Sequence, residues 1–187
     1  PFTTMNIFAL HTCPRQSARW LCDQHLNKML VESAQMIANC FEPEVLEQAP
    51  KSQKGNTRKH SYYNHPCSKW VRKNANNLLW LLHHADEIEN ERLARGFNPH
   101  FSKDFIDWAF AFWHLSPVWE IESDTTSPFA IAISEDMNCR KVPEFEERDE
   151  VWKYRYYYSL DKPFARWSRN RPEQWIDGIQ ARYKNKF

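Results

Sequence analysis

Residues 23–39, DQHLNKMLVESAQMIAN, decide the fold of this chain, because their apolar and polar side chains separate at the spacing of an α-helix. At 100° per residue, one arc of the helix holds the apolar side chains and one serine: Cys22, Leu26, Met29, Leu30, Ser33, Met36, Ile37 and Cys40. The opposite arc holds the polar side chains Gln24, His25, Lys28, Glu32, Gln35 and Asn39. The sequence therefore predicts a long amphipathic helix with one side in a hydrophobic core.

The polar arc has two interpretations. Polar faces of helices are usually solvated, and Lys28 and Glu32 would then form a surface pair four residues apart that contributes about 0.3 kcal/mol. Alternatively, the imidazole of His25, the amine of Lys28 and the carboxylate of Glu32 are groups that can move protons or attack carbon. The local pattern does not decide between the two.

The rest of the chain also follows helical spacing, interrupted by prolines and polar stretches. Residues 6–10 (NIFAL) are either a short strand or an extended segment, and residues 116–143 form a long ordered loop. The further helices that we expect cover residues 15–21, 67–95, 101–115, 145–160 and 172–184. We therefore predict an all-α fold, a single compact domain over residues 5–187 with about six helices and long ordered loops. Residues 1–4 precede Met5 and look like an expression remnant, so we expect the natural chain to begin at Met5.

Composition narrows the functional class. Only three glycines are present, and neither a Gly-rich phosphate loop nor a dinucleotide-binding pattern occurs. Five widely spaced cysteines without a C-x-x-C pair suggest neither a zinc ribbon nor a disulfide framework, and they favour a reducing compartment. With no apolar run near 18 residues, we expect a soluble, cytoplasmic, monomeric protein without a membrane contact, metal or cofactor. A metal site at His60, His65 and Cys67 is a weak alternative.

Two basic zones with interleaved aromatic residues suit a polyanionic partner. Residues 48–85 contain no Asp or Glu, and their basic residues are Lys51, Lys54, Arg58, Lys59, Lys69, Arg72 and Lys73. Residues 152–187 contain nine basic residues: Lys153, Arg155, Lys162, Arg166, Arg169, Arg171, Arg182, Lys184 and Lys186. Within these zones, we expect residues 51–73 and residues 152–171 to lie on one side of the fold and to form a nucleic-acid surface, with residues 51–61 as a mobile basic loop.

Helical spacing also predicts which aromatic and aliphatic side chains are buried. Trp70, Leu78 and Leu82 form an apolar stripe, which is more often core than a stacking platform for bases. Tyr154, Tyr156 and Tyr158 cannot all point to one side of a helix. We therefore expect at least one of these tyrosines to reach solvent or a ligand.

Several segments, in order along the chain, resemble one family. Residues 17–37, SARWLCDQHLNKMLVESAQMI, resemble the first long helix of the pyrimidine-dimer DNA glycosylases of the phage endonuclease V type and their bacterial relatives. Residues 62–73 (YYNHPCSKWVRK) resemble a bacterial segment in which Asn-His-Pro precedes a tryptophan, and residues 94–98 (ARGFN) resemble the end of a helix in the phage form. Residues 127–134 (SPFAIAIS) and the aromatic run from Trp152 are similar to later segments of that enzyme.

The resemblance implies an all-α enzyme of a bacterium or a phage-infected cell that binds duplex DNA, flips out a nucleotide and cleaves its glycosidic bond. An amine of the enzyme is the nucleophile and forms a Schiff base with the sugar, and β-elimination then breaks the strand. Glu32 aligns with the family's catalytic glutamate, His25 with a histidine of the phage form and Lys28 with a lysine of the bacterial form. The DNA-binding residues that we expect are Gln24, Gln35, Lys51, Lys54, Arg58, Lys59, His65, Arg72, Tyr154, Arg155, Tyr156, Tyr158 and Arg166.

Two points stay open at the level of sequence. The phage form uses the α-amine of the threonine after its initiator methionine; here Asn6 stands there, and its size would lead to retention of Met5. The nucleophile is therefore an N-terminal amine, Lys28 after desolvation, or water. The overall alternatives are a transferase that modifies a pyrimidine on the same scaffold and a DNA-binding protein without catalysis.

Overall fold

The computed structural model describes residues 5–187. All regular secondary structure in this part of the chain is helical, as the sequence predicted. It contains eight α-helices and three short 3₁₀-helices and no strand. The helices are α1 Pro14–Trp20, α2 Asp23–Ala38, α3 Pro43–Leu46, α4 Pro66–Val71, α5 Ala75–Ala94, α6 Lys103–Phe112, η1 Trp113–Leu115, η2 Pro117–Glu120, η3 Asn138–Lys141, α7 Glu150–Asp161 and α8 Glu173–Tyr183. Our interpretation of residues 1–4 lies outside the described residues.

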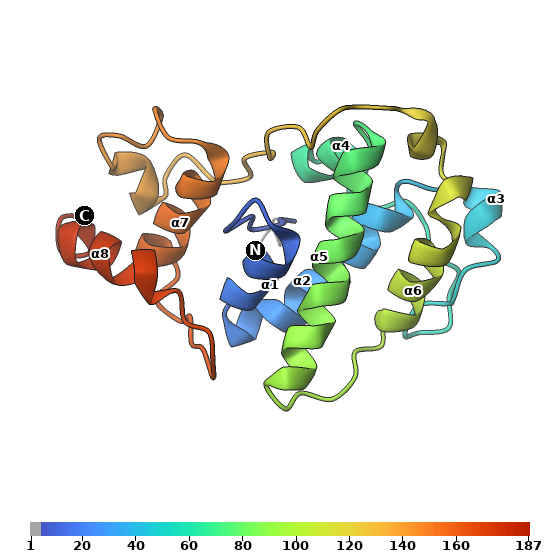
Figure 1. Ribbon diagram of the computed structural model, residues 1–187, viewed down its shortest axis with the longest axis horizontal. Helices are drawn as coiled ribbons and strands as arrows, with labels where there is room; N and C mark the ends of the chain where they lie inside the picture. Colours follow the sequence, from blue (N-terminus) through green and yellow to red (C-terminus); the bar gives the residue numbers. More distant parts are fainter. Residues whose placement is uncertain (1–4) are drawn as a thin grey trace.

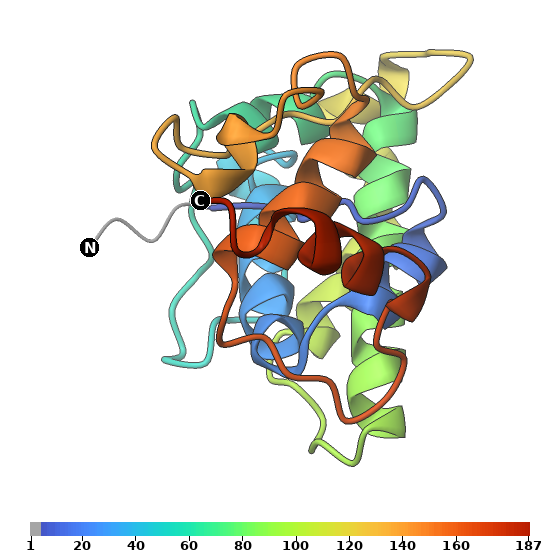
Figure 2. The same ribbon diagram turned by 90° about the vertical axis from the view of Figure 1, so that its left-hand side faces the viewer.

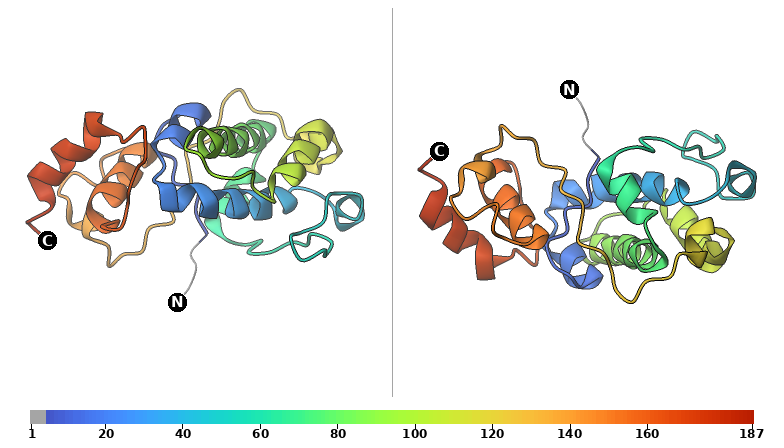
Figure 3. Two further views of the ribbon diagram at one scale, coloured as in Figure 1. Left: turned by 90° about the horizontal axis from the view of Figure 1, so that it is seen from below. Right: turned by 90° about the horizontal axis from the view of Figure 1, so that it is seen from above.

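The helices form a centre and two flanks (Figure 1). In the centre, α5 packs against both α1 and α2, and α2 crosses α5 (Figure 3). One flank holds α3 and α6, and the other holds α7 and α8, which pack on each other and face the viewer in Figure 2. The chain between η2 and η3 spans the molecule from one flank to the other (Figure 1).

One predicted helix is two helices in the structure. We expected a continuous helix over residues 67–95, but α4 ends at Val71 and α5 begins at Ala75. Asn74 between them has an extended backbone, and its side chain accepts a hydrogen bond from the amide of Asn77 at 2.9 Å. The prediction of one helix is wrong because an asparagine side chain competes well for the free amides at a helix start, and so favours a cap over a helix interior.

Other helix ends also follow capping chemistry. The helix expected from residue 145 begins only at Glu150, where the Asp149 side chain accepts a hydrogen bond from the Trp152 amide. Gly96, which the sequence indicated as the end of a helix, follows α5 with a φ of 84°. The amide of Phe97 then reaches back to the carbonyl of Arg92 at 3.0 Å, which satisfies a free carbonyl of the last turn. The expected helix 101–115 begins two residues later, as α6, and changes at Trp113 into the 3₁₀-helix η1, which ends at Leu115 as expected.

Residues 5–10 are buried and form no strand, so of our two interpretations the strand is wrong; the segment is an irregular lead-in, with a φ of 52° at Phe8. They run against α2, where the Phe8 ring stacks on the His25 ring with centroids 4.4 Å apart. Trp70, Leu78 and Leu82 are also buried, as the helical stripe predicted. The core therefore includes a stretch of irregular backbone whose polar groups need partners inside the protein.

The tyrosines of α7 correct another prediction. Tyr154, Tyr156 and Tyr158 are all buried, so none of them reaches solvent. Helical spacing does turn them to different sides, but α7 is covered on more than one side, and each hydroxyl has a partner inside the protein. Tyr154 donates to the Ala130 carbonyl, Tyr156 donates to the Glu144 carboxylate, and Tyr158 bonds with His25. Their rings serve the packing of α7 and are not exposed for a DNA contact.

The buried histidines make the stability depend on pH. Burial lowers the pKa of His25 to about 3 and that of His84 to about 4. In the unfolded chain both rings have a pKa near 6.5. The two buried neutral rings therefore leave the free energy of unfolding at its full value above pH 6.5, and that free energy decreases as the pH falls toward the folded pKa values. Below pH 6.5, we expect each of these histidines to lower the free energy of unfolding by up to about 1.4 kcal/mol for every pH unit.

Urea denaturation at pH 7 and pH 5 measures this effect. His84→Gln should flatten the pH dependence, whereas His83→Gln, at the exposed neighbouring position, should not. The same slope in both variants would contradict the assignment to the buried ring.

Candidate active site

A cavity of about 260 Å³ opens beside the middle of α2. Lys28 and Glu32 lie one turn apart on the helix, and Gln35 follows within the next turn, so their side chains share one side. The other walls come from the buried start of the described chain and from the loop before α4. The lining residues are Met5, Lys28, Val31, Glu32, Gln35 and Tyr62.

Glu32 is the buried acid of this cavity, with only 6% of its surface exposed. Its Oε2 atom accepts a hydrogen bond from the backbone amide of Asn6 at 2.8 Å. Its Oε1 atom lies 3.5 Å from the Nζ atom of Lys28, whose side chain is 41% exposed. Burial raises the pKa of Glu32 above its ordinary value, and the Asn6 hydrogen bond and the Lys28 charge oppose that rise.

This arrangement suits a carboxylate that acts on a sugar. A negative oxygen beside the cavity can stabilise positive charge that develops on a glycosidic carbon, and an acid whose pKa is raised by burial takes up a proton more readily than an exposed one. Lys28 on the outer wall adds a positive charge that can meet a phosphate. The polar arc of α2 is therefore not an ordinary solvated face.

His25 does not join this group, which corrects its placement on the reactive side of the helix. Its ring is 4% exposed and lies between Phe8 and Tyr158, and its Nδ1 atom is 2.5 Å from the Tyr158 hydroxyl. Burial and the positive charges of Lys162 and Lys28 lower its pKa, so the imidazole is neutral at pH 7. His25 joins α2 to α7 and positions the helix; it does not line the cavity.

A family model described as pyrimidine dimer DNA glycosylase matches residues 5–105, more than half of the 187-residue chain. The chain belongs to the pyrimidine dimer DNA glycosylase family. The match confirms the resemblance that the sequence segments indicated, and it contains every residue that lines the Glu32 cavity. No curated protein and no solved structure matches the chain.

The expected DNA-binding residues of this family member fall into three groups. The first group is exposed on the surface: Gln24, Lys51, Lys54, Lys59 and Arg166. Gln35 is partly exposed and lines the Glu32 cavity. The third group makes contacts that support the fold; its tyrosines are buried and its basic residues are partly exposed. It consists of the three α7 tyrosines and of His65, Arg72, Arg155 and Arg58.

The four basic residues of this third group make contacts within the protein that charge counting does not reveal. The His65 side chain caps α4 by accepting a hydrogen bond from the Cys67 amide, and the Arg72 guanidinium binds the Ser68 and Tyr63 carbonyls. Arg155 donates to the buried Leu10 carbonyl at 3.0 Å. Arg58 lies over the Phe105 ring, 4.3 Å from its centroid. Arginine often covers apolar surface with its long stem and flat head, so a basic residue in the sequence need not be a phosphate contact.

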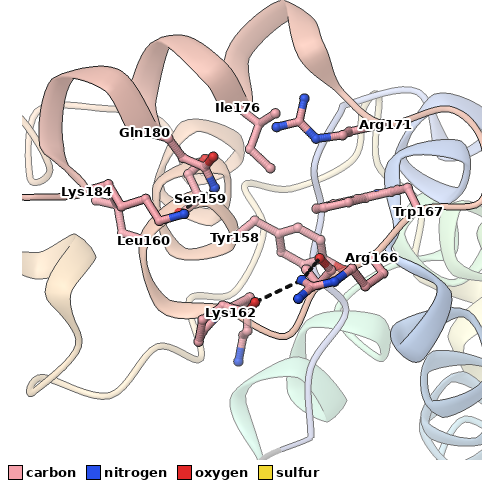
Figure 4. Close-up of a pocket in the computed structure, with 12 residues that line it drawn as sticks. Tyr158, Ser159, Leu160, Lys162, Arg166, Trp167, Arg171, Ile176, Gln180 and Lys184 are labelled. Carbon is pink, nitrogen blue, oxygen red and sulfur yellow. Dashed lines mark hydrogen bonds between the residues drawn. The ribbon is translucent and has the colours of Figure 1, made fainter.

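A second cavity, of about 340 Å³, lies between α7, α8 and the loop that joins them (Figure 4). Lys184 from α8 stands on one side of it, and Arg166, Trp167 and Arg171 stand on the other. Arg171 pairs with Asp177, whereas Arg166 and Lys184 have no carboxylate partner in the described chain. Sequence reasoning chose Arg166 from this set and missed Lys184, because only the packing of α8 on α7 brings the two together.

The loop of the second cavity is fastened to the first turn of α2. The Asp23 amide donates to the Arg166 carbonyl at 2.8 Å, and the Ser168 amide donates to the Asp23 carboxylate at 2.9 Å. The Gln24 side chain accepts a hydrogen bond from the Arg166 amide at 3.2 Å. Both cavities are therefore positioned by α2.

Sequence reasoning also missed three residues around Glu32. Met5 and Tyr62 line the cavity, and Asn6 supplies the amide that binds the carboxylate. These residues lie 26 or more positions from Glu32, and no periodic pattern connects them to it.

Two further arrangements are not found within residues 5–187. No group of three His, Cys, Asp or Glu side chains is placed to hold a metal ion, so His60, His65 and Cys67 do not make such a site. No helix in that range is long and apolar enough to cross a membrane.

Proposed function

We propose that this chain is a DNA glycosylase that removes a damaged or modified pyrimidine from duplex DNA, with Glu32 as the catalytic carboxylate. The observation that carries the proposal is the buried Glu32 side chain at the wall of a cavity, on a helix that lies within the residues matched by the family model. The general surface charge of the chain does not carry it, because several of the basic residues already have contacts within the protein.

The size of the cavity supports base flipping. At about 260 Å³ it is smaller than the roughly 300–1,000 Å³ that is typical of small-molecule sites, so it suits one nucleoside rather than a stacked base pair. A nucleotide must then leave the duplex before its glycosidic carbon approaches Glu32. Lys28 on the outer wall is placed to hold the phosphate of that nucleotide.

The amine of the lyase step is the second part of the proposal. The nitrogen of residue 6 lies 2.8 Å from the Glu32 carboxylate, but in the present chain it is a peptide nitrogen, which is not a nucleophile. Base release by water needs only Glu32. Strand scission through a Schiff base needs an amine, which Lys28 supplies or which a chain that begins at Asn6 would carry.

We expect Glu32→Gln to reduce base release by a factor of about one hundred or more, the scale of losing a positioned acid–base group. The glutamine oxygen can still accept the Asn6 hydrogen bond, and one buried charge is gone, so the free energy of unfolding should change by less than about 1 kcal/mol. DNA binding should hold or tighten, because a negative charge near phosphate is removed. The activity is measured as alkali-sensitive abasic sites in ultraviolet-treated DNA, because a base that is cut from a cyclobutane dimer stays joined to the neighbouring base, and as free bases released from DNA with modified pyrimidines.

Glu44→Gln, on the exposed α3, is the matched control and should keep full activity. Full base release by Glu32→Gln would refute the assignment of this carboxylate. If the wild-type protein bound DNA without forming any product, it would be a binding protein without catalysis. If it altered a base whose glycosidic bond stayed intact, it would be a transferase.

We expect strand scission to depend on the residue at which the chain begins. A form that starts at Asn6 has a primary amine beside Glu32 and lacks Met5, which lines the cavity in the longer chain. An α-amine with a pKa near 8 is partly neutral at pH 7, so borohydride should trap this form on DNA far more efficiently than a form that starts at Met5. Equal trapping of the two forms, abolished by Lys28→Met, would identify Lys28 as the amine instead.

We expect the second cavity to contact the DNA backbone through Arg166 and Lys184. Lys184→Met should weaken binding to undamaged duplex, and the slope of log K against log salt should fall by about 0.9 for each phosphate contact that is lost. Lys186→Met, an exposed lysine two positions away that does not line the cavity, is the control. Identical salt slopes for both variants and the wild-type protein would contradict the contact.

A further inference from the structure

Phe164 places an exposed aromatic ring on the surface between the two cavities. It has 46% of its surface exposed, and Pro163, which precedes it, lines the second cavity. On the other side, the edge of the ring meets the His25 ring, with centroids 5.7 Å apart. Because His25 precedes Lys28 by about one turn of α2, Phe164 lies between the border of the Glu32 cavity and the loop of the second cavity.

A rigid turn presents this ring. The Ala165 amide donates to the Lys162 carbonyl at 3.0 Å and so closes a β-turn. Pro163 has the second position of the turn, which its fixed φ suits, and Phe164 has the third. The Arg166 guanidinium donates to the carbonyls on both sides of Phe164, at 3.1 and 2.9 Å. Since Arg166 is also bound to the first turn of α2, the ring is fixed in an exposed position before any ligand arrives.

Positive side chains lie around the turn. The Lys162 ammonium is 5.9 Å from the centre of the Phe164 ring and donates to the Tyr157 hydroxyl at 2.9 Å. Burial and then the charge of Lys28 lower the pKa of Lys162, which places these two ammonium groups near each other. The nearby Asp161 carboxylate already accepts hydrogen bonds from the amides of residues 138 and 139. An exposed apolar ring among cations suits nucleic acid, which offers both phosphates and apolar base faces.

Other exposed aromatic rings have different surroundings. Phe112 and Trp119 are exposed to a similar degree, but they lie within residues 104–139, which include acidic residues and contain no Lys or Arg. Tyr62 lines the Glu32 cavity itself. Phe164 lines neither of the two cavities, so its ring is placed to meet the duplex between them and not a nucleotide inside one.

We propose that Phe164 is a wedge that inserts between the base pairs beside the damaged pyrimidine and opens the base stack there. Apolar side chains that enter a base step in this way partly unstack it and kink the duplex by roughly 20–90°. Lys28 on one side of the ring and Arg166 on the other would hold the phosphates that flank the opened step. The inference rests on the proposed function, because the wedge prepares the DNA on which Glu32 acts.

Binding to three duplexes tests the wedge, with Glu32→Gln present in every protein to stop turnover. The first duplex is undamaged, the second carries one cyclobutane thymine dimer, and the third also has abasic analogues opposite the dimer, so that its stack is already open. Phe164→Ala should weaken binding to the dimer duplex by about 10- to 100-fold and binding to the other two by less than about twofold. Energy transfer between dyes at the duplex ends should show that this variant bends the dimer duplex less.

Two further variants define the role of the ring. A leucine can also enter a base step, so Phe164→Leu should keep most of the dimer affinity and bending, whereas a flat stacking surface needs an aromatic ring. Phe112→Ala removes a ring of similar exposure at the end of α6 and should bind all three duplexes as its parent does.

Three results would overturn the wedge. The first is unchanged dimer binding by Phe164→Ala. The second is an equal loss of affinity for all three duplexes, which a distorted turn or a lost backbone contact would produce. The third is a loss by Phe164→Leu as large as that by Phe164→Ala.

The protein with Glu32 intact separates a failure of the wedge from a failure of the proposed function. If it forms alkali-sensitive abasic sites in the dimer duplex and its Phe164→Ala variant forms them equally fast, only the wedge fails. If it neither prefers the dimer duplex to the undamaged one nor forms abasic sites in it, the proposed function fails for this lesion and the wedge fails with it.

Discussion

The segment from Met5 to Leu10 passes through the core without a strand partner, and the rest of the structure depends on satisfying its backbone. A buried amide or carbonyl without a hydrogen bond is costly, so side chains from three helices must reach this segment. Ser17 of α1 accepts from the Leu10 amide, Arg155 of α7 donates to the Leu10 carbonyl, and Glu32 of α2 accepts from the Asn6 amide. The same requirement that joins the helices also brings a carboxylate into the interior.

Glu32 therefore has two opposing effects on the stability of the fold. As a hydrogen-bond acceptor it supports the fold, and a glutamine could do that equally well. As a charge it is partly desolvated, which raises its pKa and opposes stability at neutral pH. An ionisable residue in a place where a neutral one would fold as well points to chemistry, and natural proteins commonly accept such costs at their active sites.

The helix that carries Glu32 is fixed at both ends by contacts with loops from elsewhere in the chain. At its start, Asp23 binds Ser168 of the loop after α7 and the fully buried Arg95 side chain at the end of α5. Near its other end, Asn39 binds Ser61 and so sets the position of Tyr62. The family match ends at residue 105, but the helices beyond it complete this frame, since Tyr158 of α7 binds His25. Catalytic geometry depends on such support, because small displacements of reacting groups slow catalysis.

The sequence by itself determined the helical class, the amphipathic α2, the core stripe through Leu78 and Leu82, and the family. These features follow from local periodicity and from segments in order along the chain. It did not determine that Asn74 divides two helices, that the α7 tyrosines are all buried, or that His25 leaves the reactive face. Only the tertiary structure decided these, because each depends on what packs against the helix from elsewhere in the chain. The same reason separates Glu32, which a helical pattern indicated, from Asn6 and Tyr62, which reach it only through folding.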